Sequence, residues 1–142
     1  MKGRIFSFLA LNRFNFGGRT IHQFIIFEHK RIGSLLFFWF HKSDKVQDRF
    51  HTHAFNALSF KLYGSYDEHT INENEPNLIK INERKSIIKY FPRDSFHAIG
   101  KSKMGCLTML ISGPWKPTWK EKIGNSIITY NWNRTILKEE TC

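Results

Sequence analysis

Short apolar segments separated by turn-forming residues run through the whole chain, and this pattern limits the fold more than any other feature. Apolar residues at helical spacing are hard to find. Ten segments of strand length are present, among them TIHQFIIFE (20–28), SLLFFWF (34–40), FHTHAFNALSFKLY (50–63) and CLTMLIS (106–112). Glycine or proline interrupts the chain at Gly17-Gly18, Gly33, Pro92 and Gly113-Pro114. Many short strands with frequent turns are typical of sandwiches and barrels, so the sequence predicts an all-β domain.

Three polar segments are expected to lie outside the strands. Asp67 and Glu68 predict a turn, NENEPN (72–77) a loop, and WKPTWKEK (115–122) a loop or a short helical turn. The apolar segment IFSFLAL (5–11) near the start is expected to be a strand that pairs with a second copy, because unpaired strand edges attract partners. We therefore expect a homodimer.

Length and composition favour one cytoplasmic domain. The 142 residues suit a single domain over 1–142, and 14 Phe with 4 Trp supply more aromatic surface than a disordered chain carries. Two cysteines, Cys106 and Cys142, form no disulfide framework, which indicates a reducing compartment. Cys106 is expected to be a small buried hydrophobic residue, or a thiol facing the interior.

No membrane partner is expected. The apolar run LLFFWF (35–40) is far shorter than the roughly 18 residues of a membrane-spanning helix. The start, MKGRIFSFLAL, has the charge pattern of a signal peptide, but Asn12 and Arg13 interrupt it and no cleavage site follows.

The net charge of +10 points to an anionic partner. It arises from 22 Lys and Arg against 12 Asp and Glu, and the basic residues are scattered along the chain. A small anionic ligand or a nucleic acid would suit such a protein, although charge of this kind can also serve solubility alone.

The motif FHTHAF (50–55) contains the best candidates for chemistry. On a strand, residues two apart project from the same face, so His51 and His53 are expected to point the same way. Two imidazoles on one face can offer nitrogens to a metal ion at about 2.0–2.2 Å. The pair alone is weak support, because two polar histidines at a strand edge would look the same.

The spacing of residues around this pair resembles the cupin superfamily. His51, His53 and Gly64 fall on its first motif, and Pro92 and His97 fall on its second. Five other motif positions depart from the family pattern: Lys45, Ala57, Ser86, Asp94 and Lys101. The segment CLTMLISGPWKPTW (106–119) is also similar to small single-domain cupins of bacteria and phages. The resemblance covers about residues 20–120 and leaves 121–142 as a C-terminal strand or extension.

The resemblance implies a cupin-type double-stranded β-helix, a jelly-roll barrel, with a metal bound by His51, His53 and His97. The family's glutamate ligand is replaced by Ala57, which by strand periodicity would share the face of His51 and His53. Asp48, Glu68 and His22 are candidates to replace it. Three neutral histidines resemble the thiol-dioxygenase branch of cupins and favour Fe(II), with Mn, Ni or Zn as alternatives. A cupin that has lost its metal is a further alternative.

The resulting hypothesis is a non-haem iron dioxygenase-like enzyme acting on a small anionic substrate. One alternative is a sugar or sugar-nucleotide isomerase or lyase. Another is a non-catalytic binder or inhibitor of a small molecule, nucleic acid or protein. Tyr63 and Glu68 are candidate catalytic residues, and Arg84 and Arg93 are candidate clamps for a carboxylate or phosphate. His29, His41 and His69 are expected to be exposed.

Overall fold

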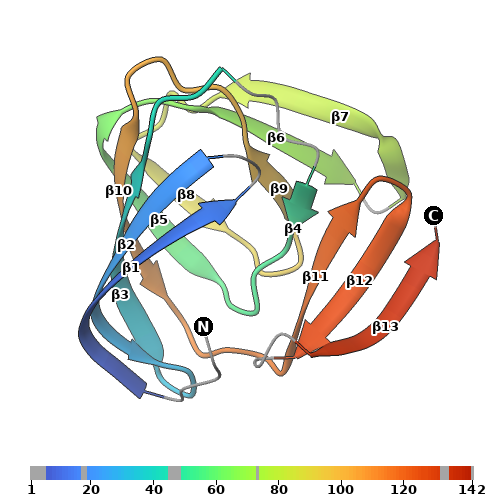
Figure 1. Cartoon of the computed structure of the whole chain (residues 1–142), viewed down its shortest axis with the longest axis horizontal. Coiled ribbons are helices and arrows are strands. Elements are labelled where there is room, and N and C mark those ends of the chain that lie inside the picture. Colours follow the sequence, from blue (N-terminus) through green and yellow to red (C-terminus); the bar gives the residue numbers. More distant parts are fainter. Residues whose placement is uncertain (1–5, 17–18, 45–48, 73, 132–134, 142) are drawn as a thin grey trace.

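The chain folds into antiparallel β-strands, and no helix occurs in the described residues (Figure 1). The computed structural model describes residues 6–16, 19–44, 49–72, 74–131 and 135–141. The strands are β1 (Phe6–Phe16), β2 (Arg19–His29), β3 (Gly33–Phe40), β4 (Arg49–His51), β5 (Ala57–Gly64), β6 (Asp67–Asn72), β7 (Glu75–Glu83), β8 (Ile88–Phe91), β9 (Phe96–Ile99), β10 (Cys106–Ser112), β11 (Thr118–Ile123), β12 (Ser126–Asn131) and β13 (Ile136–Thr141). The all-β prediction is confirmed.

Two sheets face each other across the interior. One has six strands in the order β1-β2-β3-β10-β5-β8, and the other has seven in the order β13-β12-β11-β4-β9-β6-β7. Figure 1 shows β1, β2, β3 and β10 on one side of the molecule and β11, β12 and β13 on the other. Neighbours in each sheet are often distant in sequence, so the fold brings together residues that no local motif connects.

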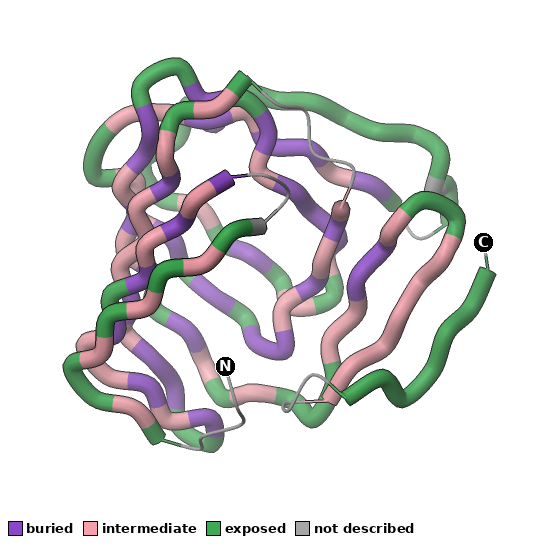
Figure 2. Tube along the Cα trace, in the orientation of Figure 1, coloured by how far each residue is buried: buried purple, intermediate pink, exposed green. Residues whose placement is uncertain are grey.

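The hydrophobic core lies between the sheets. Burial alternates along β10, and Figure 2 shows buried and more exposed positions following each other on this strand. Ile25, Leu36 and Leu110 from the six-stranded sheet form one cluster with Phe55 and Phe91. A second cluster contains Cys106, which is fully buried as expected. Burying such side chains stabilises the fold by about 1.5–3 kcal/mol each.

The segment expected to be one strand over 50–63 is two strands in different sheets. β4 ends at His51 and β5 begins at Ala57, and the residues between them cross from the seven-stranded to the six-stranded sheet. Ala54 O accepts a hydrogen bond from Lys116 N at 2.6 Å, which fixes the crossing. The expectation that Ala57 shares a strand face with His51 and His53 is therefore wrong, because periodicity does not carry through the crossing.

Three segments expected to be turns or loops contain strand residues. Asp67 and Glu68 lie in β6, where Gly100 N donates a hydrogen bond to Asp67 O. The polar segment 115–122 contributes most of β11, which pairs with both β4 and β12. β6 and β7 also extend into the segment 72–77. Polar strands were missed because their partners lie in other parts of the sequence.

Gly64 occupies a position that a side chain would not tolerate. Its φ is +72°, and a Cβ there would collide with the carbonyl oxygen of Gly105. Glycine adopts this conformation readily because it has no Cβ. Gly64 therefore allows the end of β5 to approach the start of β10 closely.

Within the part of the chain that the structure describes, no helix is long and apolar enough to span a membrane.

Candidate metal centre

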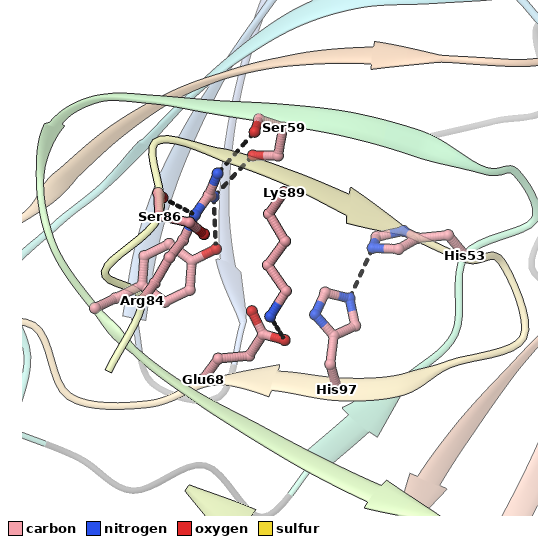
Figure 3. Close-up of polar contacts among 8 residues, drawn as sticks. His53, Ser59, Glu68, Arg84, Ser86, Lys89 and His97 are labelled. Carbon is pink, nitrogen blue, oxygen red and sulfur yellow. Dashed lines mark hydrogen bonds and ion pairs between the residues drawn. The ribbon is translucent and has the colours of Figure 1, made fainter. Parts of the chain in front are cut away.

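Three histidines from two parts of the sequence converge between the sheets. His51 on β4 and His97 on β9 are direct cross-strand partners, and His53 follows β4 by two residues. Their candidate ligand nitrogens all lie within 4.8 Å of one another. The Nε2 atoms of His53 and His97 are 2.8 Å apart, and Figure 3 shows these two rings facing each other.

Backbone hydrogen bonds hold His53 in place although β4 has ended. Thr52 N donates to Lys120 O at 2.8 Å, and Lys120 N donates to the Thr52 hydroxyl at 2.9 Å. His53 N donates to Arg93 O at 3.1 Å. The His51 and His53 ring centroids consequently lie 5.1 Å apart. The expectation that the two rings point the same way holds, but these hydrogen bonds rather than a continuous strand produce it.

Aromatic side chains support the rings. Phe55 stacks on His53 with a centroid distance of 5.0 Å, and Phe91 lies 5.0 Å from His97. His97 is buried, whereas His51 and His53 are half-buried. Packing therefore fixes the three rings on the side that faces the core. The His51 and His53 rings remain accessible from the opposite side.

Burial favours the neutral form of all three imidazoles. It lowers the pKa of His51 to about 3, with a further contribution from His53, and it lowers the pKa of His53 to about 4. The pKa of His97 also falls well below its ordinary value through burial and the neighbouring histidines. Neutral imidazole is the form that binds metal.

The donor set fits one divalent metal ion. Ligand nitrogens at about 2.1 Å from a common ion are roughly 3.0–3.5 Å apart. The Nε2 atoms of His53 and His97 are 2.8 Å apart, and all the candidate ligand nitrogens lie within 4.8 Å. Imidazole is accepted by iron, manganese, nickel and zinc. His51, His53 and His97 could hold such an ion with small ring movements, and other coordination positions would remain open.

An ion pair beside His97 was not anticipated from the sequence. Lys89 Nζ on β8 lies 2.5 Å from Glu68 Oε1 on β6, so the pair joins the two sheets. Glu68 is buried, whereas about a third of the Lys89 side chain is exposed. Figure 3 shows the pair next to the His97 ring. The charge of Lys89 contributes to the lowered pKa of His97, after burial and the other histidines.

Arg84 is not an anion clamp. Its guanidinium is buried and donates to Ser59 Oγ and O, Tyr66 Oη, Ser86 O and Ile87 O. These contacts use the five N–H donors of an arginine. Arg84 instead ties the segment after β7 to β5, as Figure 3 shows for Ser59 and Ser86.

Tyr63 does not reach the interior. Its side chain is 54% exposed and packs 6.1 Å from the ring of Trp39. A register shift between Leu107 and Thr108, opposite this part of β5, breaks the parity that predicted an inward side chain. The catalytic role expected for Tyr63 is therefore not supported.

None of the proposed replacements for the fourth ligand joins the histidines. Glu68 pairs with Lys89. His22 lies on β2 and contacts His41, with 3.1 Å between ring nitrogens. Asp48 lies outside the described residues. The described part of the chain thus supplies three ligands to this group.

Two other predictions concern Arg93 and His69. Arg93 holds His53 through its backbone, and its Nε lies 3.6 Å from the exposed carboxylate of Asp94. Its role as a clamp stays a prediction. His69 was expected to be exposed but is buried, because β6 lies between β7 and β9 and turns this side chain toward Gly100.

A hollow of about 320 Å³ lies beside the segment that leads into His97. It is lined by Thr70, Ile71 and Asn72 of β6 and by Asp94, Ser95 and Phe96. Phe96 precedes His97, but the histidines themselves do not line the hollow. The hollow is therefore separate from the candidate metal centre.

Solved structures are similar to this fold, whereas no protein-family model and no curated protein matches the sequence. Oxalate decarboxylase from Bacillus subtilis aligns with a TM-score of 0.54 and 13% identity over 81% of this chain. The capsular polysaccharide assembling protein CapF from Staphylococcus aureus aligns with a TM-score of 0.53 and 13% identity over 74% of this chain.

The chain has the cupin fold.

The chain spans only about 30% of the length of oxalate decarboxylase and 28% of that of CapF. A further structure of the Bacillus enzyme, at a TM-score of 0.54, concerns its Mn(II) centres. Likeness at this identity shows the fold alone. The cupin fold and the converging histidines together define a candidate centre for a divalent metal.

Proposed function

We propose that this cupin binds one divalent metal ion through His51, His53 and His97 and acts as a metal-dependent enzyme on a small anionic compound. The convergence of three neutral imidazoles within 4.8 Å carries the proposal. Burying three imidazoles costs free energy, and a metal ion bound by all three would offset that cost.

The neutral ligand set favours an anionic substrate. A carboxylate ligand would cancel part of the charge of a divalent ion, whereas imidazoles leave it intact. No carboxylate of the described residues belongs to the group. A substrate carboxylate or similar anion would therefore bind at an open position of the ion and supply the missing negative charge.

Lys89 supports the same substrate class. It points between the sheets beside His97 (Figure 3). Its ammonium lies 5.2 Å from the centre of the Phe91 ring. An ammonium has three donors, and Glu68 Oε1 accepts one of them. We assign to Lys89 the anion-binding role that the sequence suggested for Arg84.

The reaction type that we propose first is dioxygenase-like, with Fe(II) as the metal. Bound iron would supply a Lewis acid and redox chemistry at the open positions. The three histidines would hold the ion, and Lys89 would orient an anion. Phe55 and Phe91 would shield this anion. Manganese with a small dicarboxylate is the second choice, since an oxalate decarboxylase is among the structural neighbours.

Oxygen uptake tests the proposal. Protein loaded anaerobically with Fe(II), Mn(II) or Zn(II) would be mixed with a panel of small carboxylates and thiol carboxylates, including oxalate. We expect oxygen consumption with Fe(II), and only when a substrate is present. Carbon dioxide release without oxygen consumption would support the manganese alternative. The His53→Ala variant serves as the control, and equal turnover by this variant would contradict the proposal.

A non-catalytic binder is the second candidate, and the net charge of +10 favours it. Binding to a nucleic acid would weaken steeply with added salt because condensed counterions are released. Salt-sensitive binding that persists in the His53→Ala variant, without turnover in any metal form, would favour this candidate. The isomerase alternative needs a free base near the metal, and Glu68, the nearest candidate, is paired with Lys89.

A further inference from the structure

Arg19, the first residue of β2, is a charged side chain inside the fold. Buried positions alternate along this strand from Arg19 through Ile21, Gln23 and Ile25, so Arg19 points inward like the apolar residues that follow it. Only 2% of Arg19 is exposed. Its Nη2 donates a hydrogen bond to Gly100 O, just after β9, and Figure 1 shows the start of β2 near the end of β9.

The other donors of Arg19 have no acceptor. Its Nε and Nη1 atoms are buried, and neither has a hydrogen-bond partner among the described residues. These two atoms carry three of the five N–H donors of a guanidinium. Arg19 also takes part in none of the ion pairs that the described residues form. Because a buried charge without a partner is costly, Arg19 needs an anion that the described part of the chain does not supply.

The interior around Arg19 is positively charged. Arg19, Lys61 and Arg84 all lie close enough to the buried Cys106 thiol to favour its ionised form. Burial nevertheless raises the pKa of Cys106, so the thiol stays neutral and does not balance these cations. The buried carboxylate of Glu68 already has an ion-pair partner on β8. Of the three cations, Arg84 spends its donors on protein acceptors, whereas Arg19 has donors to spare.

A second polar group without a partner contacts the same glycine. His69 is 2% exposed, and its Nδ1 is buried and has no hydrogen-bond partner among the described residues. A Cβ at Gly100 would collide with His69 Nε2, so the ring lies directly against this glycine. Arg19 and His69 thus meet the chain at one residue, and both leave buried nitrogens unused there.

Exposed lysines surround this end of the molecule. Lys101 and Lys103 are exposed on the connection from β9 to β10, which begins at Gly100. An isolated β-bridge joins this connection to the segment 42–44, which adds exposed Lys42 and exposed Asp44. These four charged residues are net positive and would attract an anion toward Arg19.

We propose that Arg19 binds a small oxyanion, a phosphate or carboxylate group, at the end of the barrel where β2 begins and β9 ends. Guanidinium groups match the oxygens of both kinds of anion with charge-assisted hydrogen bonds. The bound anion would neutralise the buried charge and accept hydrogen bonds from Nε and Nη1. The anion must be small, because Arg19 is almost fully enclosed.

The oxyanion site is separate from the metal centre. Arg19 lies beside Cys106, which belongs to the second hydrophobic cluster, whereas aromatic residues of the first cluster pack against His53 and His97. A full-length His53→Ala variant, in which the metal centre is disrupted, should therefore keep the oxyanion site. Anion binding in this variant cannot come from a metal ion held by the three histidines, so the two proposals can fail independently.

Calorimetric titration of the His53→Ala variant with inorganic phosphate tests the proposal. Acetate serves as the carboxylate probe, and sodium chloride keeps the ionic strength equal. We expect saturable binding of at least one of the two probes, and the one that binds more tightly identifies the class of oxyanion. Adding Arg19→Met should weaken this binding at least about 30-fold, because charge-assisted hydrogen bonds are lost. Adding Arg13→Met, at an exposed position of β1, should leave it unchanged.

Urea unfolding gives an independent test with the same variants. Without phosphate or acetate, adding Arg19→Met should not lower the urea midpoint, because it removes an unpaired buried charge. Phosphate should raise the midpoint of His53→Ala by more than that of the Arg19→Met variant, since the general effect of phosphate on stability is shared by both. Arg19→Lys keeps the charge but not the planar donors, so it should also bind the probe more weakly.

Three results would overturn the proposal. His53→Ala protein that shows no saturable binding of phosphate or acetate would do so without any change at Arg19. Equal affinity after Arg19→Met or Arg19→Lys would place the anion elsewhere. A lower urea midpoint of Arg19→Met in the absence of both probes would show that the chain itself satisfies this guanidinium.

Discussion

At the scale of single residues, the three histidines should make stability depend on pH. In the folded protein the pKa values of His51 and His53 are lowered to about 3 and about 4, against about 6.5 for an exposed histidine. At pH values between about 4 and 6.5 the unfolded chain binds more protons than the folded protein. Metal-free protein should therefore lose stability as the pH falls from about 6.5 toward 4. Urea midpoints measured across this range would check it.

The matched variant for this experiment is His51→Ala. It removes one lowered pKa, so its stability should decline less steeply with acid than that of the wild type. His29→Ala should behave like the wild type, because His29 lies at the end of β2 and is not one of the three converging histidines. An identical acid response in wild type and His51→Ala would contradict the assignment.

A second prediction at this scale concerns Lys89. The Lys89→Met variant keeps an apolar side chain of similar length but loses the ammonium, so metal-loaded protein should bind small carboxylates about tenfold more weakly. It should also be less stable by about 2–3 kcal/mol, because Glu68 is left buried without its partner. Calorimetric titration with oxalate and urea unfolding measure the two effects.

The double variant Lys89→Met/Glu68→Gln separates the two effects. Removing the buried charge should recover much of the stability, while anion binding stays weak. Lys103→Met, at an exposed position, is the control for a lost positive charge. Recovery of anion affinity in the double variant would show that Lys89 has only a structural role.

Sequence reasoning found the histidines but not the residues around them. His51, His53 and His97 have a recognisable spacing, whereas Lys89 stands between Ile88 and Tyr90 on β8. Alternation there predicts that the apolar pair faces the core, but the structure turns Lys89 inward and leaves Ile88 and Tyr90 exposed on the outer side of the sheet. The usual rule that apolar residues point inward fails because both sides of this sheet are apolar.

At the scale of elements, strands with apolar periodicity were predictable and polar strands were not. β3 and β10 match the expected segments because their runs of aromatic, β-branched and other apolar residues favour strands. β11 carries two lysines and a glutamate and forms through hydrogen bonds to β4 and β12. The crossing between β4 and β5 was missed since its residues, Thr52 to Asn56, include no glycine or proline.

Gly64 gives a prediction at the element scale. Gly64→Ala should destabilise the protein by more than Gly124→Ala, because both have positive φ but only Gly64 faces a backbone atom at collision distance. The conformational strain alone costs about 1–2 kcal/mol in each variant. Urea midpoints of the two variants check this. Equal losses of stability in the two variants would mean that β5 and β10 can move apart at Gly64 without a cost in free energy.

At the scale of the whole molecule, the fold class followed from many short segments together rather than from any one of them. The cupin fold was indicated by a few spaced residues, of which Gly64 and the histidines have clear structural reasons. The apolar outer side of the six-stranded sheet is different, since it becomes visible only when the register of the strands is known.

The central claim is that His51, His53 and His97 hold one divalent metal ion, and metal content measures it most directly. Wild type, His51→Ala, His53→Ala, His97→Ala and the control His29→Ala would be incubated in turn with Fe(II), Mn(II), Ni(II) or Zn(II), desalted, and analysed by mass spectrometry of the elements. We expect about one ion per chain in the wild type and the control, and a strong loss in each of the other variants. Wild-type protein that retains none of these metals above the level of His51→Ala would contradict the account.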